Sequence, residues 1–351
     1  MTQLDLIFRA MRIYNVEETG QKLKNLSPVA ICMATDAGYA FPTAIVAKSI
    51  AQRQYPNIGP IYFIWADNEK PPPELIAFLG KNGITLVIAQ NSLLRLMEPA
   101  HAGYLTAASA TRLFLATILE KFSIDKFLYL DGDVEIARSL SPLAEIDLPD
   151  DHIAAVEDYK LFFSALDPKL FAAWKNRLHN LAMPEGAPYF NSGVILAHMQ
   201  SWAKISAEAQ KFHHANAAAC ISFDQCALNA VCHDKRLVLS PRWNFQPALF
   251  PLMVEASVDP GIVHFCGPYK PWAPVPFTRP WQARKPFLAA RSELPQLWEK
   301  TALRGSLKHS LRLYKKMLKL RFKKKAPIDK ERRFFLDYLS NTRFADRAEH
   351  F

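Results

Sequence analysis

The stretch of sequence that decides the fold is Phe127-Leu128-Tyr129-Leu130-Asp131-Gly132-Asp133-Val134. Its first half is aromatic and aliphatic, which is typical of a β-strand covered on both faces. Two aspartates follow at once, separated by Gly132. In an extended or turning backbone, residues i and i+2 project to the same side, and the glycine removes the Cβ that would crowd the space between them. The stretch therefore predicts a buried strand that ends in two carboxylates aimed at one point.

Two carboxylates aimed at one point repel each other unless a cation lies between them. A divalent metal with oxygen ligands is the simplest such cation. The alternative is a surface turn, because Asp-Gly is a common turn dipeptide. The preceding strand favours the metal site, since ligands collect at the carboxyl ends of strands in open α/β sheets. We therefore predict that Asp131 and Asp133 bind a metal ion.

Apolar runs and segments of helical periodicity alternate along the rest of the chain. Further strands are expected at 29–34, 61–65, 84–89, 154–156 and 194–197, and helices at 39–54, 74–79, 107–121, 169–181 and 200–217. Strand–helix alternation of this kind predicts a mostly parallel sheet with helices on both faces. Prolines are frequent between residues 241 and 295, where we expect ordered loop wrapped on the domain. The predicted fold class is α/β.

Length and composition are those of a globular protein with a large core. The chain has 351 residues, of which 50% are hydrophobic. The five cysteines are odd in number and their spacing matches no zinc or disulfide pattern, so we expect free thiols in a reducing compartment. No uncharged apolar run reaches the roughly 20 residues of a membrane span, and residues 1–25 lack the apolar core of a signal peptide. We expect a cytoplasmic protein.

The net charge of +10 comes from a single segment of the chain. The segment from Ala302 to Lys325 holds ten Lys and Arg and no acidic residue, and the other 33 basic residues match the 33 acidic ones. Its apolar residues recur at about 100° per residue, the pattern of a basic amphipathic helix at an anionic membrane surface. A solvated helix packed on the domain and a nucleic-acid patch are the alternatives. We divide the chain into an N-terminal extension (1–27), a main domain (28–300) and this basic tail (301–351).

Two further places in the chain combine polar residues with an expected strand. Asp36 follows the first expected strand, where it would accept hydrogen bonds from a ribose or a base, or cap the next helix. Asn191, Ser192 and Gly193 interrupt an apolar strand. Polar residues followed by a glycine within an otherwise buried strand indicate that a ligand approaches the backbone closely there. A bulge or a turn is the alternative.

Two more candidate groups follow. Asp224 and Gln225 open a helix, where helix capping is the simpler interpretation and hydrogen bonding to sugar hydroxyls the alternative. His264 would complete an Asp-Asp-His metal site, although a lone histidine is more often a core residue. Nearby, Gly267 would let its backbone N–H approach a phosphate and Lys270 would offer that phosphate a positive charge.

These motifs occur in the order seen in retaining glycosyltransferases of family 8, and they most resemble those of bacterial lipopolysaccharide galactosyl- and glucosyltransferases. The resemblance runs from about Val29 to about Trp272. The matching motifs are Ala34-Thr35-Asp36, Asp131-Gly132-Asp133, Tyr189-Phe190-Asn191-Ser192-Gly193-Val194, Asp224-Gln225 and His264-Phe265-Cys266-Gly267-Pro268-Tyr269-Lys270-Pro271-Trp272. The resemblance implies a GT-A fold, with the main domain as its glycosyltransferase domain, that binds a UDP-sugar and Mn²⁺.

The resemblance also assigns roles to single residues. The implied Mn²⁺ ligands are Asp131, Asp133 and His264, and Asp131 with Gly132 also matches substrate-contacting positions. The implied uridine-contacting turn is Ala34, Asp36 and Gly38, although the family commonly has Asn where this chain has Gly38. The implied donor-sugar contacts are Arg112, Asn191, Ser192, Asp224 and Gln225, and the implied diphosphate contacts are Gly267 and Lys270.

The reaction implied by the resemblance is transfer of galactose or glucose from UDP to a lipopolysaccharide core or related saccharide, with retention of configuration. An amide is a poor nucleophile, so we favour same-face substitution in which Asp224 and Gln225 position the sugar. One alternative is a non-catalytic nucleotide-sugar-binding protein. Another is a membrane- or nucleic-acid-associated protein whose binding depends on its basic tail. The intact Asp-x-Asp motif argues against the first, and the neutral body argues against nucleic acid. The tail predicts a peripheral location at the cytoplasmic face of the inner membrane.

Overall fold

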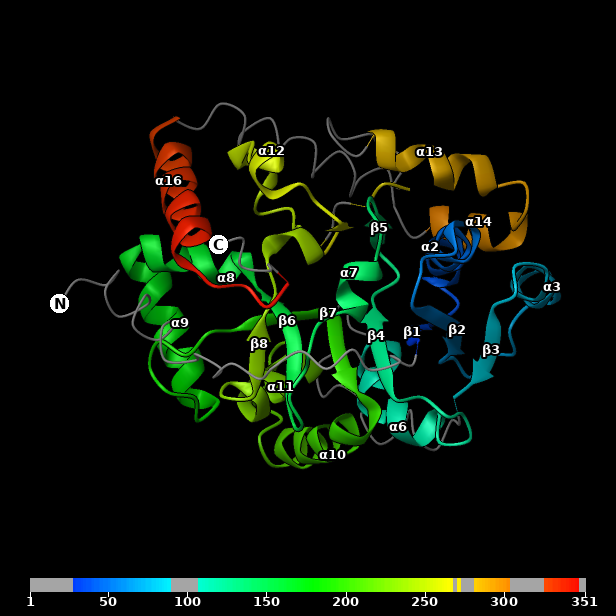
Figure 1. Ribbon diagram of the computed structural model, residues 1–351, viewed down its shortest axis with the longest axis horizontal. Helices are drawn as coiled ribbons and strands as arrows, with labels where there is room; N and C mark the ends of the chain where they lie inside the picture. Colours follow the sequence, from blue (N-terminus) through cyan, green and yellow to red (C-terminus); the bar gives the residue numbers. More distant parts are fainter. Residues whose placement is uncertain (1–27, 90–106, 268–269, 273–280, 304–324, 347–351) are drawn as a thin grey trace.

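A seven-stranded sheet in the order β3-β2-β1-β4-β7-β6-β8 runs through the middle of the molecule (Figure 1). The computed structural model describes residues 28–89, 107–267, 270–272, 281–303 and 325–346. The strands of this sheet are β1 (Val29–Thr35), β2 (Ile58–Trp65), β3 (Thr85–Ile88), β4 (Lys126–Leu130), β6 (Ile153–Glu157), β7 (Phe190–His198) and β8 (Arg236–Val238). Within this sheet, β7 runs antiparallel to both of its neighbours and the other pairs are parallel. The predicted mostly parallel sheet is confirmed.

Helices cover the sheet. The longer ones are α2 (Ala40–Arg53), α3 (Pro73–Lys81), α9 (Pro168–Asn180), α10 (Met199–Ala215), α11 (Asp224–Cys232), α13 (Trp281–Ala290), α14 (Pro295–Leu303) and α16 (Lys325–Asn341). The shorter ones are α7 (Ser141–Ala144), α8 (Tyr159–Phe162), η2 (Phe163–Leu166), η3 (Pro241–Trp243), η4 (Phe250–Leu252) and α12 (Glu255–Val258). In Figure 1, α10 and α11 lie together beside one part of the sheet, and α13 and α14 lie beside α2. The helices expected at 39–54, 74–79, 169–181 and 200–217 are confirmed within a few residues.

The single helix expected over 107–121 is wrong. The segment divides into α5 (Ala107–Ala110), the 3₁₀ helix η1 (Thr111–Phe114) and α6 (Leu115–Ile118). Side chains of α10 donate to backbone carbonyls of this segment: Trp202 donates its Nε1–H to the Arg112 carbonyl at 2.9 Å, and Gln210 donates to the Leu113 carbonyl at 2.7 Å. Helical periodicity alone does not reveal such partners from a distant helix.

The proline-rich part of the chain holds more regular structure than expected. Besides η3, η4 and α12, it contributes strand β9 (Ile262–His264), which pairs antiparallel with β5 (Val134–Ile136) to form a second, two-stranded sheet. The register joins Val134 to His264. The strand that begins directly after Asp133 is therefore held beside the histidine of a motif more than a hundred residues away.

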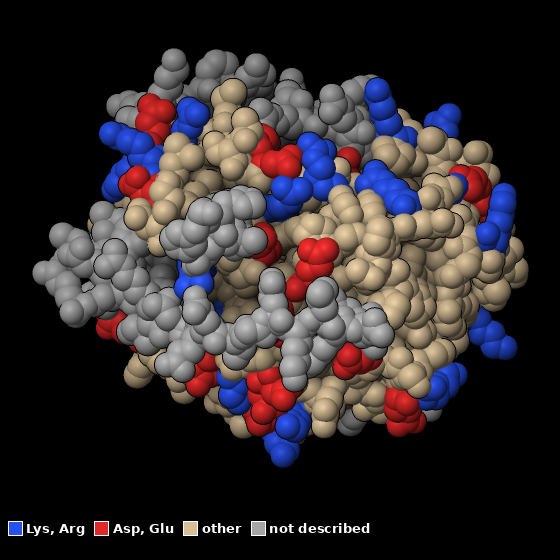
Figure 2. Space-filling view, in the orientation of Figure 1, with Lys and Arg blue, Asp and Glu red and all other residues tan. Residues whose placement is uncertain are grey.

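The C-terminal helix packs against the domain through aromatic side chains. Phe334 and Tyr338 of α16 lie against Phe162 of α8, with ring centroids 4.8 and 4.9 Å apart. Phe335 is completely buried. In Figure 1, α16 lies next to α8 and α9, and Figure 2 shows Lys and Arg side chains at the edge of the molecule where this helix lies. The basic amphipathic stretch expected over 303–322 lies almost entirely outside the described residues, and the division of the chain at residue 301 stays a prediction.

Beyond α16, the chain is fastened to the loop that carries η3. The Asp346 carboxylate accepts hydrogen bonds from the Ser240 backbone N–H at 2.7 Å, the Ser240 hydroxyl at 2.6 Å and the Trp243 indole N–H at 2.8 Å. The Ala345 N–H also donates to the Val238 carbonyl at 3.0 Å. Ala345 and Asp346 are therefore held against Val238, Ser240 and Trp243.

All five cysteines are free thiols. Among the helices of the described residues, none combines the length and the apolar character needed to span a lipid bilayer.

We predict that Asp346→Ala lowers the free energy of unfolding by about 1–3 kcal/mol, because the Trp243 indole and the Ser240 amide lose their acceptor in a partly buried place. Urea unfolding followed by circular dichroism measures this change. Asp337→Ala, at an exposed position on α16, is the control and should stay within about 0.5 kcal/mol of wild type. Equal stability of Asp346→Ala and wild type would contradict the prediction.

Candidate active site

Parallel strands bring the predicted acidic residues to one edge of the sheet. Strands β1 and β4 are parallel neighbours in which Cys32 pairs with Tyr129. Asp36 and Asp131 each follow the end of their strand, so both lie at the carboxyl edge of the sheet. The pairing of β5 with β9 then adds Asp133 and His264 to the same edge.

The three predicted metal ligands lie together. One ligand atom from each of Asp131, Asp133 and His264 lies within 4.8 Å of the others. The Nε2 atom of His264 is 3.2 Å from Asp133 Oδ1 and 3.7 Å from Asp131 Oδ2. Bonds from nitrogen and oxygen ligands to a zinc-sized ion are about 2.0–2.2 Å long, so one ion can reach all three atoms. Two carboxylates and one imidazole are a donor set that fits a divalent ion such as Mn²⁺.

Two glycines leave room for this cluster. A Cβ on Gly193 would lie 2.3 Å from His264 Cε1 and 2.6 Å from Asp131 Oδ2. A Cβ on Gly132 would lie 2.0 Å from the Thr43 hydroxyl oxygen in α2. The polar triplet that begins at Asn191 lies inside β7 at a register shift against β6. The bulge expected there is therefore present, and the side chains of His264 and Asp131 approach the backbone at Gly193. The approach of a ligand to this backbone stays a prediction.

Lys270 forms an ion pair with Asp133 and donates to the Phe265 carbonyl at 2.8 Å. Burial alone would raise the pKa of Asp133, but Lys270 and then His264 hold it below its ordinary value. Burial alone would lower the pKa of Lys270, and Asp133 raises it above its ordinary value. Both partners are therefore charged, and a partly buried ammonium lies at the edge of the metal-ligand cluster.

Arg112 connects the metal ligands to the predicted sugar-binding residues. Its Nη2 is 3.0 Å from Asp131 Oδ1, its Nε is 2.8 Å from Asp224 Oδ2, and its Nη1 donates to the Ser192 carbonyl. The guanidinium carbon lies 4.6 Å from the centre of the Tyr129 ring. Within the described part of the chain, these contacts leave a second N–H on each terminal nitrogen for a ligand.

Asp224 and Gln225 face this arginine and β7. The N-cap position of α11 belongs to Phe223, and the Asp224 side chain turns to Arg112 rather than capping the helix. Burial raises the pKa of Asp224 to about 6, although Arg112 opposes this shift. The Gln225 Oε1 atom accepts from the Ser192 N–H at 3.1 Å. The capping interpretation is therefore not supported, and both side chains lie among the predicted donor-sugar positions.

The predicted uridine turn lies beside Lys270. Asp36 Oδ1 accepts from the backbone N–H groups of Gly38 at 2.8 Å and Tyr39 at 3.0 Å, so Asp36 closes the turn that leads into α2. The Lys270 ammonium is 5.5 Å from the centre of the Tyr39 ring. The uridine contacts of this turn, including Ala34 at the end of β1, stay predictions, and so does the diphosphate contact of Gly267. The φ of +87° at Gly267 is a conformation that favours glycine.

Two functional candidates escaped the reasoning from sequence. Asn244 lies between His264 and Asn191, with its Oδ1 3.0 Å from His264 Nδ1 and its Nδ2 2.9 Å from Asn191 Oδ1. Asp158 accepts from the Gln225 side-chain amide at 3.0 Å. Asp158 directly follows β6, as Asp131 follows β4, so an acid placed immediately after a strand was the signal that could have found it. No comparable signal marks Asn244.

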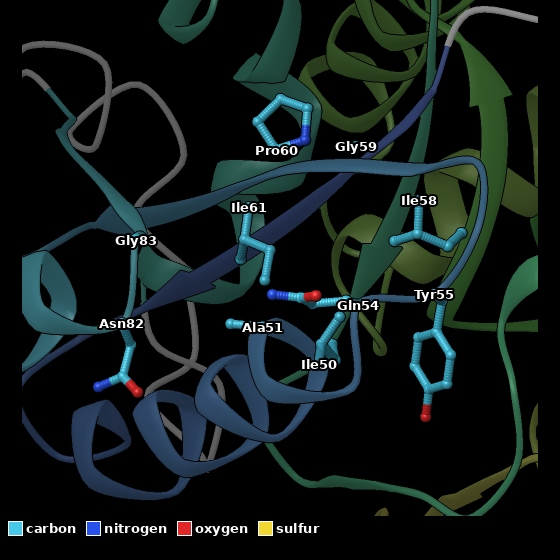
Figure 3. Close-up of a pocket in the computed structure, with 10 residues that line it drawn as sticks. All are labelled: Ile50, Ala51, Gln54, Tyr55, Ile58, Gly59, Pro60, Ile61, Asn82 and Gly83. Atoms are coloured by element: carbon cyan, nitrogen blue, oxygen red, sulfur yellow. The ribbon is translucent and has the colours of Figure 1, made fainter.

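A pocket of about 290 Å³ lies away from this cluster (Figure 3). It is lined by Ile50, Ala51, Gln54, Tyr55, Ile58, Gly59, Pro60, Ile61, Asn82 and Gly83. Figure 3 shows Gln54 and Ile61 turned toward the same space between α2 and β2. Because the pocket borders the beginning of β2 while the acidic cluster follows the ends of β1 and β4, it lies at the opposite end of the strands from the candidate active site.

Comparison with known proteins agrees with this geometry. Lipopolysaccharide glucosyltransferase WaaO of Escherichia coli (strain K12) is 25% identical over 312 residues, covering 81% of this chain and 86% of WaaO. General stress protein A of Bacillus subtilis (strain 168) is 28% identical over 222 residues, covering 59% of this chain and 72% of that protein. A solved structure of galactosyltransferase LgtC with donor and acceptor sugar analogs superposes with a TM-score of 0.60 at 23% identity, covering 76% of this chain and 100% of LgtC, which shows the shared GT-A fold.

The family model for glycosyl transferase family 8 matches residues 30–275. This span is more than half of the chain and contains every residue of the metal-ligand cluster. The expected family and the expected enzyme class are confirmed: the chain belongs to glycosyl transferase family 8 and is a retaining hexosyltransferase.

Proposed function

We propose that this enzyme transfers galactose or glucose from a UDP-sugar to a lipopolysaccharide core or a related saccharide, with Mn²⁺ as its metal ion. The observation that carries the proposal is the convergence of Asp131, Asp133 and His264 beside two cations, the buried Arg112 and the partly buried Lys270. The name of WaaO, a relative that matches most of this chain, supports glucose and a lipopolysaccharide acceptor. The resemblance of the motifs supports galactose equally.

Departure of UDP leaves growing negative charge on a diphosphate. An ion bound by the three ligands supplies positive charge at that place. Lys270 holds a second positive charge within reach of the same place, because it already contacts Asp133. Fixed cations in a site from which water is partly excluded stabilise such charge more than cations in bulk water do. The diphosphate would therefore lie beside the three ligands, within reach of Lys270.

The donor sugar would lie against Arg112, Ser192 and Gln225. The remaining N–H groups of Arg112 are donors that match sugar oxygens, whereas the Ser192 hydroxyl already faces Asp224 Oδ2 and Gln225 Oε1 as acceptors, at 3.5 and 3.4 Å. Asp224 is buried against Arg112 and fixes the direction of the guanidinium. We assign Asp224 to positioning and Arg112 to contact with the sugar.

Retention of configuration is best explained by same-face substitution. The Gln225 amide donates to Asp158 at 3.0 Å, and its oxygen accepts from the Ser192 N–H at 3.1 Å. An amide oxygen that is already hydrogen-bonded is a weak nucleophile. Gln225 would instead orient the sugar while the acceptor hydroxyl attacks from the side that UDP leaves.

The basic segment supports a peripheral location at an anionic membrane surface. Residues 304–324 join α14 to α16, and both of these helices pack on the domain. Each cation near an anionic leaflet contributes about 1 kcal/mol, so this segment would bind such a surface reversibly.

The donor prediction is tested with radiolabelled UDP-glucose, UDP-galactose, GDP-mannose and ADP-glucose, each with a lipopolysaccharide core acceptor. We expect transfer from one or both UDP-hexoses with Mn²⁺ and none in EDTA. Asp131→Ala and Asp133→Ala should lower the rate about 100-fold or more, because the ion and its charge on the leaving group are lost. Asp329→Ala, exposed on α16, is the control. Near-normal turnover of either metal-ligand variant at saturating donor and Mn²⁺ would remove the metal role.

The close packing of Gly193 against His264 and Asp131 gives a second test of the metal site. Gly193→Ala should lower Mn²⁺ affinity and transfer by about tenfold or more, because the added methyl group collides with His264 and Asp131. Gly80→Ala in α3 is the matched control, since a Cβ there meets no atom within 4 Å. Unchanged Mn²⁺ affinity in Gly193→Ala, measured by electron paramagnetic resonance of the free ion, would show that the cluster is not the metal site.

Membrane binding is tested by charge removal rather than by truncation at Ala302, because truncation would also remove α16 and its buried aromatic side chains. Changing Arg312, Lys315, Lys316 and Lys319 to Gln should release most of the protein from sedimenting phosphatidylglycerol vesicles. Changing Lys330, Arg332 and Arg333 of α16 to Gln is the matched control outside the segment. Unchanged sedimentation of the first variant would reject the membrane role of the segment.

A further inference from the structure

We propose that Asn244 is a positioning residue that orients His264 in the metal-ligand cluster and Asn191 at the donor-sugar position. This inference rests on the proposed function, because it concerns the ion and the sugar that the site would hold. Asn244 is completely buried, and its side chain touches both partners: Oδ1 is 3.0 Å from His264 Nδ1, and Nδ2 donates to Asn191 Oδ1 at 2.9 Å.

The hydrogen bonds determine which end of the Asn244 amide faces which partner. The Asn191 Oδ1 atom also accepts from the Gly193 backbone N–H at 3.1 Å, so this atom has to be the oxygen of its amide. It therefore requires a donor from Asn244, which only the NH₂ end provides. The oxygen of Asn244 is then left facing His264 Nδ1.

An oxygen facing Nδ1 requires the proton of the imidazole to be on Nδ1. The other ring nitrogen, Nε2, then faces the carboxylates, 3.2 Å from Asp133 Oδ1, where it would give its lone pair to an ion held between them. A metal-binding histidine needs this arrangement, and a partner that holds its second nitrogen is a recurring feature of metal sites. Asn244 thus selects the tautomer and the ring orientation that suit an ion.

The backbone around Asn244 is held in place from both sides. Phe245 exchanges hydrogen bonds with β9, donating to the Ile262 carbonyl at 2.9 Å and accepting from the His264 N–H at 3.0 Å. On the other side, Trp243 is held by Asp346 at 2.8 Å. Asn244 therefore lies beside His264 by strand pairing, so its amide has little freedom to turn away.

The Asn244 amide consequently connects the metal-ligand cluster with the predicted donor-sugar position at Asn191. The chain of contacts runs from His264 through Asn244 and Asn191 to Gly193, whose carbonyl accepts from the Asp131 N–H at 2.9 Å. In the described part of the chain, no hydrogen bond occupies the Asn191 Nδ2 group, which leaves it for a sugar hydroxyl. Loss of Asn244 should disturb both the ion and the sugar.

The test measures Mn²⁺ affinity of the full-length protein without donor or acceptor, from the electron paramagnetic resonance signal of free Mn²⁺. Asn244→Ala should bind Mn²⁺ about 10-fold or more weakly than wild type. Asn244→Asp keeps an oxygen that faces His264 Nδ1 and should restore affinity to within about threefold of wild type. In the same proteins, both variants should lose affinity for the UDP-hexose relative to UDP, because neither donates to Asn191.

Gln246→Ala is the matched control. Gln246 is likewise a buried amide with one donated bond, to the Glu157 carbonyl at 2.7 Å, and one accepted bond, from the Tyr159 N–H at 3.1 Å. Among the described residues, its side chain forms no hydrogen bond with Asp131, Asp133 or His264. Gln246→Ala should lose stability and keep Mn²⁺ affinity. The inference is overturned if Asn244→Ala binds Mn²⁺ like wild type, if Gln246→Ala weakens binding equally, or if Asn244→Asp restores nothing. Wild type that binds no Mn²⁺ would overturn the proposed metal function itself, and the inference with it.

Discussion

The antiparallel pairing of Val134 with His264 is the contact on which the site depends. It places the histidine of one motif beside the carboxylates of another, although the two motifs are far apart in the chain. Since side chains alternate along a strand, a slip of one residue in this short ladder would turn His264 to the opposite face. The absence of a side chain at Gly193 completes the arrangement, because it lets Asp131 and His264 approach β7.

Three acids of the site, Asp131, Asp133 and Asp224, each have a cation beside them. Arg112 lies between Asp131 and Asp224, and Lys270 lies against Asp133. Burying charges costs free energy unless their partners are well placed, and removal of one partner leaves the other uncompensated. These charges therefore depend on one another, and the residues proposed to bind the donor also orient one another.

The sequence predicted the sheet and the position of Asp131 and Asp133 because both depend on local features. The apolar runs of β1, β2 and β4 are strong signals, and Asp131 and Asp133 follow a strand directly. Strand β9 has three residues, too few for periodicity to reveal, so its pairing with β5 was not predicted. Asn244 was missed because its role comes from contacts at a distance, and the helix break near Arg112 was missed because carbonyls satisfied by α10 leave no mark on the local pattern.

The docked C-terminal helix changes how the basic segment would act at a bilayer. If the basic segment were attached to the domain at one end only, the enzyme could rotate freely relative to the membrane surface. Residues 304–324 are instead secured at both ends, by α14 beside α2 and by α16 beside α8, which lie toward opposite sides of the molecule in Figure 1. A lipid-bound segment anchored in this way would restrict rotation of the whole enzyme. The same sheet edge would then be presented repeatedly to acceptors that diffuse in two dimensions.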